Sequence, residues 1–363
     1  DFDAATYGPF HFDVRRLALG FHVAAEELGA GSPIAMAEAV VAGYVGEVGA
    51  MDAGRSAATA MAAGEDHGEI LNYTLRKAAE DGAAREELDD YTRVLGARRE
   101  MFFGEVEPAV DWEVGGHAMA VARDAVVPMS AAEMRDVAHL VGQWPATLVD
   151  AEVMAASAMA IKGASRRLGA GIASFAAPRF YVLLEGPTTA LGDDVLLEIK
   201  RVYDPPPLPG FVRLPGRAFA DNGARVVAMQ RALQTTALGD PLLGSGNVGA
   251  ASYRVRDRSK FQRGVDLAKI AEKLDEGDFA AEDLLVLAGQ AGRLLARSHA
   301  RAARQSGASG LLAISAALAS EPEGFVTETV AFVGDYAPVL RGDYERFMAA
   351  LAADGPALGY QTR

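Results

Sequence analysis

Apolar residues recur at intervals of three and four from about Phe12 to Ala164. This is the spacing of amphipathic helices, which bury one stripe of their surface. The clearest run is Leu17, Phe21, Ala24, Ala25 and Leu28. Glycine-rich breaks at "LGAGSP" and "AAGED" divide the segment into several helices. The pattern predicts a helical lobe over residues 1–165.

The pattern changes between Arg166 and about Phe261. Two runs, "RFYVLLEG" and "DDVLLEIKRVY", have the apolar and β-branched composition of strands, and a Gly-Pro turn joins them. A Pro-rich crossing, "DPPPLPG", leads to a helix near "ARVVAMQRALQ" and to another extended piece, "SYRVRD". Residues 166–262 are therefore predicted to form a small lobe that contains a sheet.

The remaining residues, 263–363, are again helical in pattern, and their clearest helix runs from about Ala281 to Arg304. One face of this helix is predicted to be buried and the opposite face to be basic, with His299 at the edge of the buried face. The predicted buried residues are Leu284, Leu287, Ala288, Ala291, Leu295 and Ser298, and the basic ones are Arg293, Arg297, Arg301 and Arg304. This segment is predicted to complete the large helical lobe.

Composition narrows the class of partner. The formal net charge of −14 argues against nucleic acid, because phosphate contacts need clustered Lys and Arg. Cysteine is absent, so disulfides and thiolate chemistry are excluded. No apolar run long enough to span a membrane and no leader segment stand out, which favours a cytoplasmic protein without a membrane partner. The first residue is Asp, which suggests a processed or incomplete chain, and the oligomeric state cannot be inferred.

The first residues, "DFDAATYGPFHFDVRRLALGF", carry candidate chemistry. Asp1 and Asp3 flank a Phe ahead of a Gly-Pro turn, and short carboxylates suit a hard cation such as Mg²⁺. The alternative is a pair of acids on an ordinary turn around a buried Phe. Asp13 heads the following helix, where it could act as an N-cap.

The small lobe supplies a second candidate element. Gly169 and Gly171 precede a strand, where glycine lets backbone N–H groups approach phosphate closely. Lys200 ends the apolar run "VLLEIK", so that a single cation projects from a mostly buried strand; the alternative is an edge-strand lysine that faces water. A glycine hairpin, a strand that carries Lys and then a helix is the order found in the nucleotide-holding lobe of protein kinases.

The other motifs are better explained without a catalytic or metal-binding role. The acids and histidine of Glu65–Glu69 are predicted to form a solvated loop, and His117 and His139 to be packed or surface residues of helices. The acids of Asp111–Glu113 could act as general acid and base, yet no opposing group is visible. The sequence contains no Gly-x-Ser-x-Gly elbow and no complete P-loop, so serine hydrolases and Walker-type NTPases lack support.

As an ordered set, several segments resemble a bacterial family, the domain of unknown function 2252, over essentially all 363 residues. They are "DFDAATYGPFHFDVRRLA", "YVLLEG", "LLEIK", "ARVVAMQRALQ", "YRVRD", "LARSHAR" and "YAPVLRGDYERF". Members carry, just before the Asp-Phe-Asp, a Gly-Asp-x-His-x-x-Asn-like segment similar to the catalytic loop of aminoglycoside phosphotransferases and choline kinases. The resemblance implies that this chain begins just after that loop.

The resemblance also implies a fold. It predicts an α+β protein that is protein kinase-like and circularly permuted, with a small antiparallel β lobe over a large helical lobe. The permutation is needed because the glycine hairpin and Lys200 follow the Asp-Phe-Asp, whereas in ordinary kinases they precede it. Asp1 and Lys200 are expected to face one cleft between the lobes, with Asp3 nearby.

Roles for individual residues follow from the resemblance. Asp1 and Asp3 would be catalytic metal ligands for Mg²⁺, and Lys200 would grip the phosphates of ATP. The other residues expected at the nucleotide are Gly169, Gly171, Arg254 and Arg256, the arginines near the hinge that holds the purine. The expected supporting residues are Asp13, Gln230, His299 and Arg301.

The chain departs from the family pattern in three respects. The first is that the Asp and Asn of the family's catalytic loop belong to a segment upstream of Asp1. The other two lie within the chain. Ala176, Ala177 and Pro178 occupy the second half of a hairpin that is richer in glycine in the family, and Ala228 stands where the family has an acid that pairs with the lysine. The function that the resemblance implies is an ATP- and Mg²⁺-dependent phosphotransferase with a small-molecule acceptor. The alternative is a catalytically weak kinase-like module that binds nucleotide or a protein partner.

Overall fold

The fold is described from a computed structural model. It describes residues 2–60, 65–80, 86–105, 110–114, 117–121, 125–150, 160–168, 177–205, 219–234, 240–258, 264–305 and 309–354. Asp1, Gly169, Gly171 and Ala176 lie outside these residues, and so do the side chains of Asp111, Glu113 and His117.

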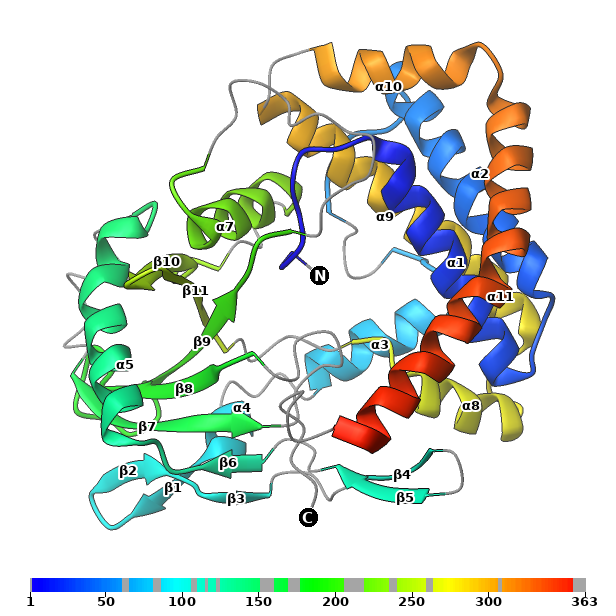
Figure 1. Ribbon diagram of the computed structural model, residues 1–363. Coiled ribbons are helices and arrows are strands. Elements are labelled where there is room, and N and C mark those ends of the chain that lie inside the picture. The colour runs from blue at the N-terminus through cyan, green and yellow to red at the C-terminus, as the bar shows by residue number, and fades with distance from the viewer. Residues whose placement is uncertain are drawn as a thin grey trace.

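Helices from both ends of the chain pack together on one side of the molecule (Figure 1). The extensive contact between α2 and α9 forms the centre of this helical cluster, and α1 and α11 pack against α2. The helices are α1 (Phe10–Leu28), α2 (Pro33–Asp52), α3 (Glu69–Glu80), α8 (Leu267–Asp275), α9 (Ala281–Gln305), α10 (Ser309–Ala319) and α11 (Pro322–Asp354).

Local sequence explains where α1 and α2 meet. α1 ends at Gly29, whose φ of 58° places it in the left-handed region that favours glycine at a helix C-terminus. Ser32 begins α2, because its side chain accepts a hydrogen bond from the backbone N–H of Ala35. Pro33 occupies the first turn of α2, where no backbone N–H is needed. A short turn therefore sets the two helices side by side.

One helix within the described residues, α2, is long and apolar enough to cross a membrane by length and composition. The prediction that the chain contains no apolar run of this length is therefore wrong for Pro33–Asp52. α2 packs against α1, α9, α10 and α11, and the side chains of Val40, Val41 and Tyr44 are wholly buried in the helical core. Core helices of globular proteins have the same composition.

The other half of the molecule is built on a seven-stranded antiparallel sheet with the order β10-β11-β9-β8-β7-β6-β3. α7 (Asn222–Leu233) lies between this sheet and α9 (Figure 1). The strands are β3 (Gly104–Glu105), β6 (Ala125–Val127), β7 (Ile161–Leu168), β8 (Arg179–Leu184), β9 (Val195–Val202), β10 (Gly244–Val248) and β11 (Ala251–Asp257). The prediction of a mixed α+β protein with an antiparallel sheet is confirmed.

Alternation along the strands gives the sheet two different faces. On β8 and β9, Phe180, Val182, Leu197 and Ile199 point to one side, where they form a core with α5 (Ala131–Gln143). A capping box of Ser130 and Glu133 begins α5, and the helix leads into η1 (Trp144–Thr147), whose buried Trp144 joins the same core. The intervening residues of the strands form the opposite face, described below.

The prediction of a nearly continuous helical segment up to Ala164 is wrong for much of the chain after Tyr91, where strands lie on both sides of α5. α4 (Glu86–Tyr91) runs into β1 (Thr92–Leu95), which forms a hairpin with β2 (Arg98–Met101) across a turn at Gly96, whose φ is 62°. β4 (Val110–Val114), which contains Asp111–Glu113, pairs with β5 (His117–Val121), so His117 belongs to a strand. These strands have four or five residues, which is the lower limit of length at which alternation indicates a strand.

The main sheet therefore draws strands from both sides of the boundary that the sequence suggested at residue 165. β3 and β6 come from the segment predicted as helical, and β7 begins at Ile161. Within 166–262, by contrast, the expected elements are present. Both strand-like runs form neighbouring strands, β8 and β9, and the helix near "ARVVAMQRALQ" is α7.

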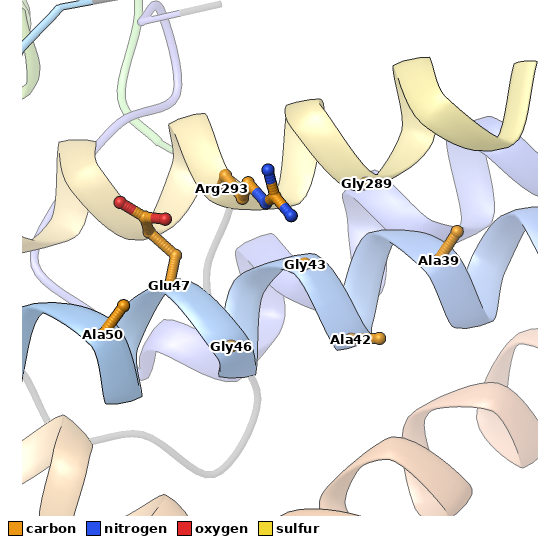
Figure 2. A pocket seen from close by; sticks show the side chains of 8 residues that line it. All are labelled: Ala39, Ala42, Gly43, Gly46, Glu47, Ala50, Gly289 and Arg293. Carbon is orange, nitrogen blue, oxygen red and sulfur yellow. The ribbon is translucent and has the colours of Figure 1, made fainter. Parts of the chain in front are cut away.

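Glycines allow α2 and α9 to approach each other closely. A Cβ added at Gly43 would lie 2.2 Å from the carbonyl oxygen of Gly289, and one at Gly292 would lie 2.0 Å from that of Val40. Backbone atoms cannot yield as a flexible side chain can. A cavity of about 440 Å³ lies beside the glycine contact, and Figure 2 shows the residues that line it, among them Glu47 on α2 and Arg293 on α9.

Replacement of Gly43 by Ala is expected to lower the free energy of unfolding by about 1–3 kcal/mol, because the new methyl group must push the α9 backbone away. Gly49→Ala on the same helix is the matched control, since no atom lies within 4 Å of its added Cβ. This control should raise stability by up to about 1 kcal/mol, as Ala is the better helix former. Urea unfolding measures both values, and equal stability of the two variants would contradict the close approach.

Candidate functional site

Lys200 lies on β9, between β8 and β11, so the alternative of a lysine on an edge strand is wrong. The residue is only 5% exposed. Burial lowers the pKa of its ammonium group, and the hydrogen bond that this group donates to Asp3 acts in the opposite direction. A buried cation at the centre of a sheet requires a partner, because desolvation of an unpaired charge is costly.

That partner is Asp3. The Lys200 ammonium donates a hydrogen bond to Oδ2 of Asp3 and forms an ion pair with it, although the two residues lie 197 positions apart in sequence. The side chain of Asp3 is 22% exposed, so this pair lies where the buried sheet face meets solvent. The structure thus brings together two of the predicted catalytic residues, while Asp1 lies outside the described residues.

Arg225 of α7 holds the backbone of residues 2–9, the stretch before α1 that we call the Asp3 segment. Its guanidinium donates hydrogen bonds to the carbonyl oxygens of Asp3, at 2.8 Å, and of Ala5. It also donates to the carbonyl of Tyr203, which follows β9, at 2.8 Å. Asn222 at the start of α7 accepts from Nε of Arg225 and orients the guanidinium. One side chain therefore ties the N-terminal segment, α7 and the end of β9 together.

Glu198, two residues before Lys200 on the same face of β9, is completely buried beneath arginines. Its carboxylate accepts hydrogen bonds from Arg256 at 2.9 Å, Arg254 at 3.1 Å and Arg179 at 3.1 Å. Burial by itself would raise the pKa of Glu198, but the attraction of these guanidinium groups outweighs it and holds the pKa well below its usual range. Glu198 is therefore ionised at neutral pH.

Arg254 connects the two charged groups. Its Nη1 lies 3.7 Å from Oδ1 of Asp3, and its Nη2 lies 3.1 Å from Oε1 of Glu198. Burial is the largest influence on the Arg254 guanidinium and lowers its pKa, while Glu198 acts in the opposite direction. The predicted nucleotide residues Arg254 and Arg256 thus belong to one cluster with Lys200, Asp3 and Glu198.

Strand register explains why these residues meet. Arg254 on β11 and Arg179 on β8 are both paired with Lys200, and Arg256 on β11 is paired with Glu198. Residues that are directly opposite on neighbouring antiparallel strands have side chains on the same face. Three adjacent strands therefore bring five charged residues to one face, which we call the charged face: Arg179, Glu198, Lys200, Arg254 and Arg256.

Two of the predicted supporting residues form a separate contact. Asp13 on α1 lies 3.2 Å from Nε2 of His299 on α9, and Nδ1 of His299 hydrogen-bonds with the Tyr44 hydroxyl at 2.8 Å. Tyr44 is buried on α2, and burial raises the pKa of its hydroxyl far above the usual value. The Asp13, His299 and Tyr44 side chains thus link three helices of the helical cluster.

The other two supporting residues lie at or near α7. Gln230 is buried on α7, and its amide donates to the side chain of Gln234 at 3.2 Å. Arg301 on α9 donates to the carbonyl of Leu233, at the end of α7, at 2.7 Å. Arg301 was expected on a basic face of α9, but its guanidinium binds backbone. α7 is thus held to α9 at one end and to the Asp3 segment, through Arg225, at the other.

The remaining candidates do not join this cluster. His139 is exposed on α5 and hydrogen-bonds with Gln143. In Glu65–Glu69, Asp66 accepts hydrogen bonds from the Gly68 N–H and from Asn72, while His67 is buried, which differs from a fully solvated loop. A second cavity, of about 660 Å³, lies beside the β1-β2 hairpin and is lined in part by Lys162, at the other end of the sheet region.

Sequence reasoning missed Glu198, Arg179, Arg225 and Tyr44. The sequence contained a signal for Glu198, because strand alternation places this residue on the same face as Lys200. A fully buried glutamate on a strand implies cationic partners. No sequence signal pointed to Arg179 or Arg225. The role of Arg179 depends on the register between strands, and that of Arg225 on where the Asp3 segment crosses α7.

The residues present fit Mg²⁺ bound to phosphate better than Mg²⁺ bound to protein alone. No group of three or more His, Asp or Glu side chains among the described residues is placed to hold a metal ion. Asp3 offers one carboxylate, whereas that of Glu198 is enclosed by arginines. Mg²⁺ commonly binds through one or two carboxylates together with substrate phosphates, and phosphates would offset the surrounding positive charge.

Fold and site together define an α+β protein in which a charged face of an antiparallel sheet meets the segment that precedes α1. A family described as "Uncharacterized protein conserved in bacteria (DUF2252)" matches residues 1–350, and the chain belongs to this family. No curated protein and no solved structure matches the chain.

Replacement of Glu198 by Gln is expected to lower the free energy of unfolding at pH 7 by about 3 kcal/mol, because buried arginines lose their anion. The pKa of Glu198 is lower in the folded protein than its ordinary value of 4.5, so the carboxylate stabilises the fold fully above that pH and progressively less below it. The difference between wild type and variant should therefore shrink as the pH falls below 4.5.

Urea unfolding between neutral and acidic pH measures this difference. Glu345→Gln, at an exposed position on α11, removes the same charge and should change stability by less than about 0.5 kcal/mol at any pH. A difference between wild type and Glu198→Gln that stays constant with pH would show that Glu198 is not the titrating group.

Proposed function

We propose that this protein is an ATP- and Mg²⁺-dependent phosphotransferase that acts on a small-molecule acceptor. The observation that carries the proposal is the contact between Lys200 and Asp3. A strand lysine that grips phosphates and an aspartate that binds the phosphate-bound Mg²⁺ must lie close together in such an enzyme. Here two residues from distant parts of the sequence do so.

The order of elements supports a permuted kinase-like arrangement. The paired strands β7 and β8 are followed by β9 with Lys200, by α7 and by β10 and β11, which is the order of a nucleotide-holding kinase lobe. Asp13 on α1 contacts His299 near the end of α9. α9, late in the sequence, thus lies beside the helix that follows the Asp-Phe-Asp, as a circular permutation requires.

Each charged residue would have a distinct task in this proposal. Lys200 and Arg254 would donate hydrogen bonds to phosphate oxygens, and Asp3 would hold Mg²⁺ against the same phosphates. When bound, Mg²⁺ neutralises the charge that develops during phosphoryl transfer. Arg225 would keep the Asp3 segment in place through its backbone contacts. Asp1, Gly169 and Gly171 keep the roles expected from the family resemblance, and a cytoplasmic location would give access to ATP.

One observation favours the alternative of a module that binds nucleotide without transfer. In active kinases a glutamate of the helix pairs with the lysine, but α7 carries Ala228 at the corresponding position of the family pattern. Lys200 instead forms an ion pair with Asp3, and this pair must open before both groups can engage a nucleotide. In this alternative ATP binds and no phosphate is released or transferred.

Replacement of Lys200 by Met is expected to weaken ATP binding by about tenfold or more and to reduce turnover, because a phosphate contact is lost. Asp3→Asn should reduce Mg²⁺-dependent turnover by about 100-fold or more while changing ATP binding less, since a metal ligand acts mainly in the transfer step. Calorimetry with ATP and Mg²⁺ and an assay of phosphate release on the full-length protein measure the two effects.

The control for these variants is Lys269→Met, which removes a partly exposed lysine of α8 that forms an ion pair with Glu272 at the surface. It should leave ATP binding and turnover unchanged. Binding without phosphate release or transfer would favour the non-catalytic module. Absence of ATP binding by folded wild-type protein would reject both functions.

Mg²⁺ by itself is expected to bind weakly, with a Kd above about 1 mM, because the cationic side chains of Lys200 and Arg254 lie beside the Asp3 carboxylate and oppose binding of a cation. ATP should strengthen metal binding by about tenfold or more by adding phosphate ligands. Electron paramagnetic resonance with Mn²⁺ as the probe measures free metal with and without ATP. Tight Mn²⁺ binding without ATP would point to a protein-only metal site and against this arrangement.

A further inference from the structure

The cavity beside the β1-β2 hairpin has the features of a second ligand site, apart from the charged face. Its volume of about 660 Å³ lies within the range of small-molecule pockets, about 300–1,000 Å³. We propose that it binds a small organic acid, whose single carboxylate contacts Lys162 and Arg99 and whose apolar body contacts the methionine and phenylalanine side chains of the wall. The inference goes beyond the proposed function and does not depend on it.

An irregularity of β7 brings Lys162 to this cavity. The pairing of β7 with β8 shifts between Ile161 and Gly163, so Lys162 is the extra residue of a β-bulge, a feature that redirects side chains and is common beside active sites. The Lys162 ammonium lies 2.9 Å and 2.8 Å from the two carboxylate oxygens of Asp194, whose side chain is wholly buried. These contacts use two of the three N–H donors and leave the third for a ligand.

Arg99 on β2 supplies a second donor at the cavity wall, although the residue is only 5% exposed. Its Nε donates to the carbonyl of Leu191 at 3.0 Å, and its Nη1 donates to Asp89 at 2.6 Å and to Thr92 at 2.7 Å. These bonds hold the guanidinium in one orientation. Nη2 donates to no atom of the described residues, whereas buried polar groups normally have a partner. A carboxylate in the cavity would provide one.

The same cavity has an apolar wall. Phe103 and Met134 line it, and these large apolar residues are 49% and 39% exposed. Met101, which is buried, lines it as well. Exposed apolar residues that gather at a cavity indicate a binding site, because an apolar ligand would remove their surface from water. Methionine thioethers also pack favourably against aromatic rings, so an aryl group suits this wall.

The charges at the cavity favour a carboxylate over a phosphate. Lys162 and Arg99 each pair with an aspartate, and the other charged residues that line the cavity are Arg98, Glu100 and Glu185. Because acids lie so close to the cations, a group with two negative charges would meet repulsion as well as attraction. A single carboxylate can use the available donors, and its apolar body adds affinity.

This cavity is separate from the charged face. Asp194 directly precedes β9, and the extended chain from there to Lys200 spans about 20 Å. A molecule bound at Lys162 is therefore too far from Lys200 to accept a phosphoryl group in the proposed reaction. The ligand of the cavity is a different molecule from the acceptor.

The test is calorimetry of the full chain with three probes that differ only in their polar end: phenylpropionate, phenylpropanol and phenylpropylamine. Phenylpropionate should bind with a Kd of about 1 mM or lower. The alcohol should bind about tenfold or more weakly, because it makes no charge-assisted hydrogen bond, and the amine more weakly still. ATP with Mg²⁺ should leave the phenylpropionate affinity unchanged.

Variants test the two parts of the wall. Met134→Glu should weaken phenylpropionate binding about tenfold or more, because it removes an apolar contact and repels the carboxylate. Ala132→Glu is the matched control, since it adds the same charge at an exposed position of α5 about 200° around the helix, and it should bind like wild type.

Lys162→Met combined with Asp194→Asn removes the ion pair without leaving a buried charge alone. This double variant should reduce the preference for phenylpropionate over phenylpropanol by about fivefold or more. Urea unfolding of each variant confirms that the measured protein is folded.

Three results would overturn the inference: equal affinity of wild type for the acid and the alcohol, unchanged phenylpropionate affinity in folded Met134→Glu, or displacement of phenylpropionate by ATP with Mg²⁺. Absence of phenylpropionate binding at about 10 mM would do so as well. None of these bears on whether ATP binds at Lys200, so the proposed function and this inference can fail independently.

Discussion

The charged face depends on the ion pairs between the carboxylate of Glu198 and the arginines around it. This carboxylate is wholly buried, yet it is stable as an anion because Arg179, Arg254 and Arg256 surround it. Without it, these guanidinium groups would repel one another in a place with little water to screen them. With it, three strands present their cations in fixed positions, and Arg254 is left in reach of Asp3. The geometry of the candidate site is thus set by one anion within the sheet.

A second constraint brings the N-terminal segment to that face. Arg225 binds the backbone of this segment and the carbonyl after β9, while Arg301 binds the other end of α7 to α9. α7 therefore acts as the connector between the sheet and the helical cluster. In the kinase-like arrangement that we propose, the helix would position the aspartate segment through an arginine, where active kinases position the lysine through a glutamate.

Close packing of α2 on α9 completes this arrangement. α9 carries both His299, which contacts Asp13, and Arg301, which contacts α7, so its position determines where α1 and α7 lie. Gly43 and Gly292 permit backbone contacts that any side chain would prevent. The close approach of α2 and α9 thus influences the candidate site, although none of these glycines contacts a residue of the site.

The sequence by itself determined the elements whose pattern is long enough to read. The spacing of apolar residues was sufficient for α1, α9 and α7, and the apolar runs before Glu185 and around Lys200 were sufficient for β8 and β9, because periodicity is a local property. It failed for the short strands after Tyr91. Only the tertiary structure decided that Lys200 meets Asp3 and that Glu198 gathers arginines from β8 and β11, because these contacts depend on strand register and on where distant segments cross. Neither is encoded in the spacing of neighbouring residues.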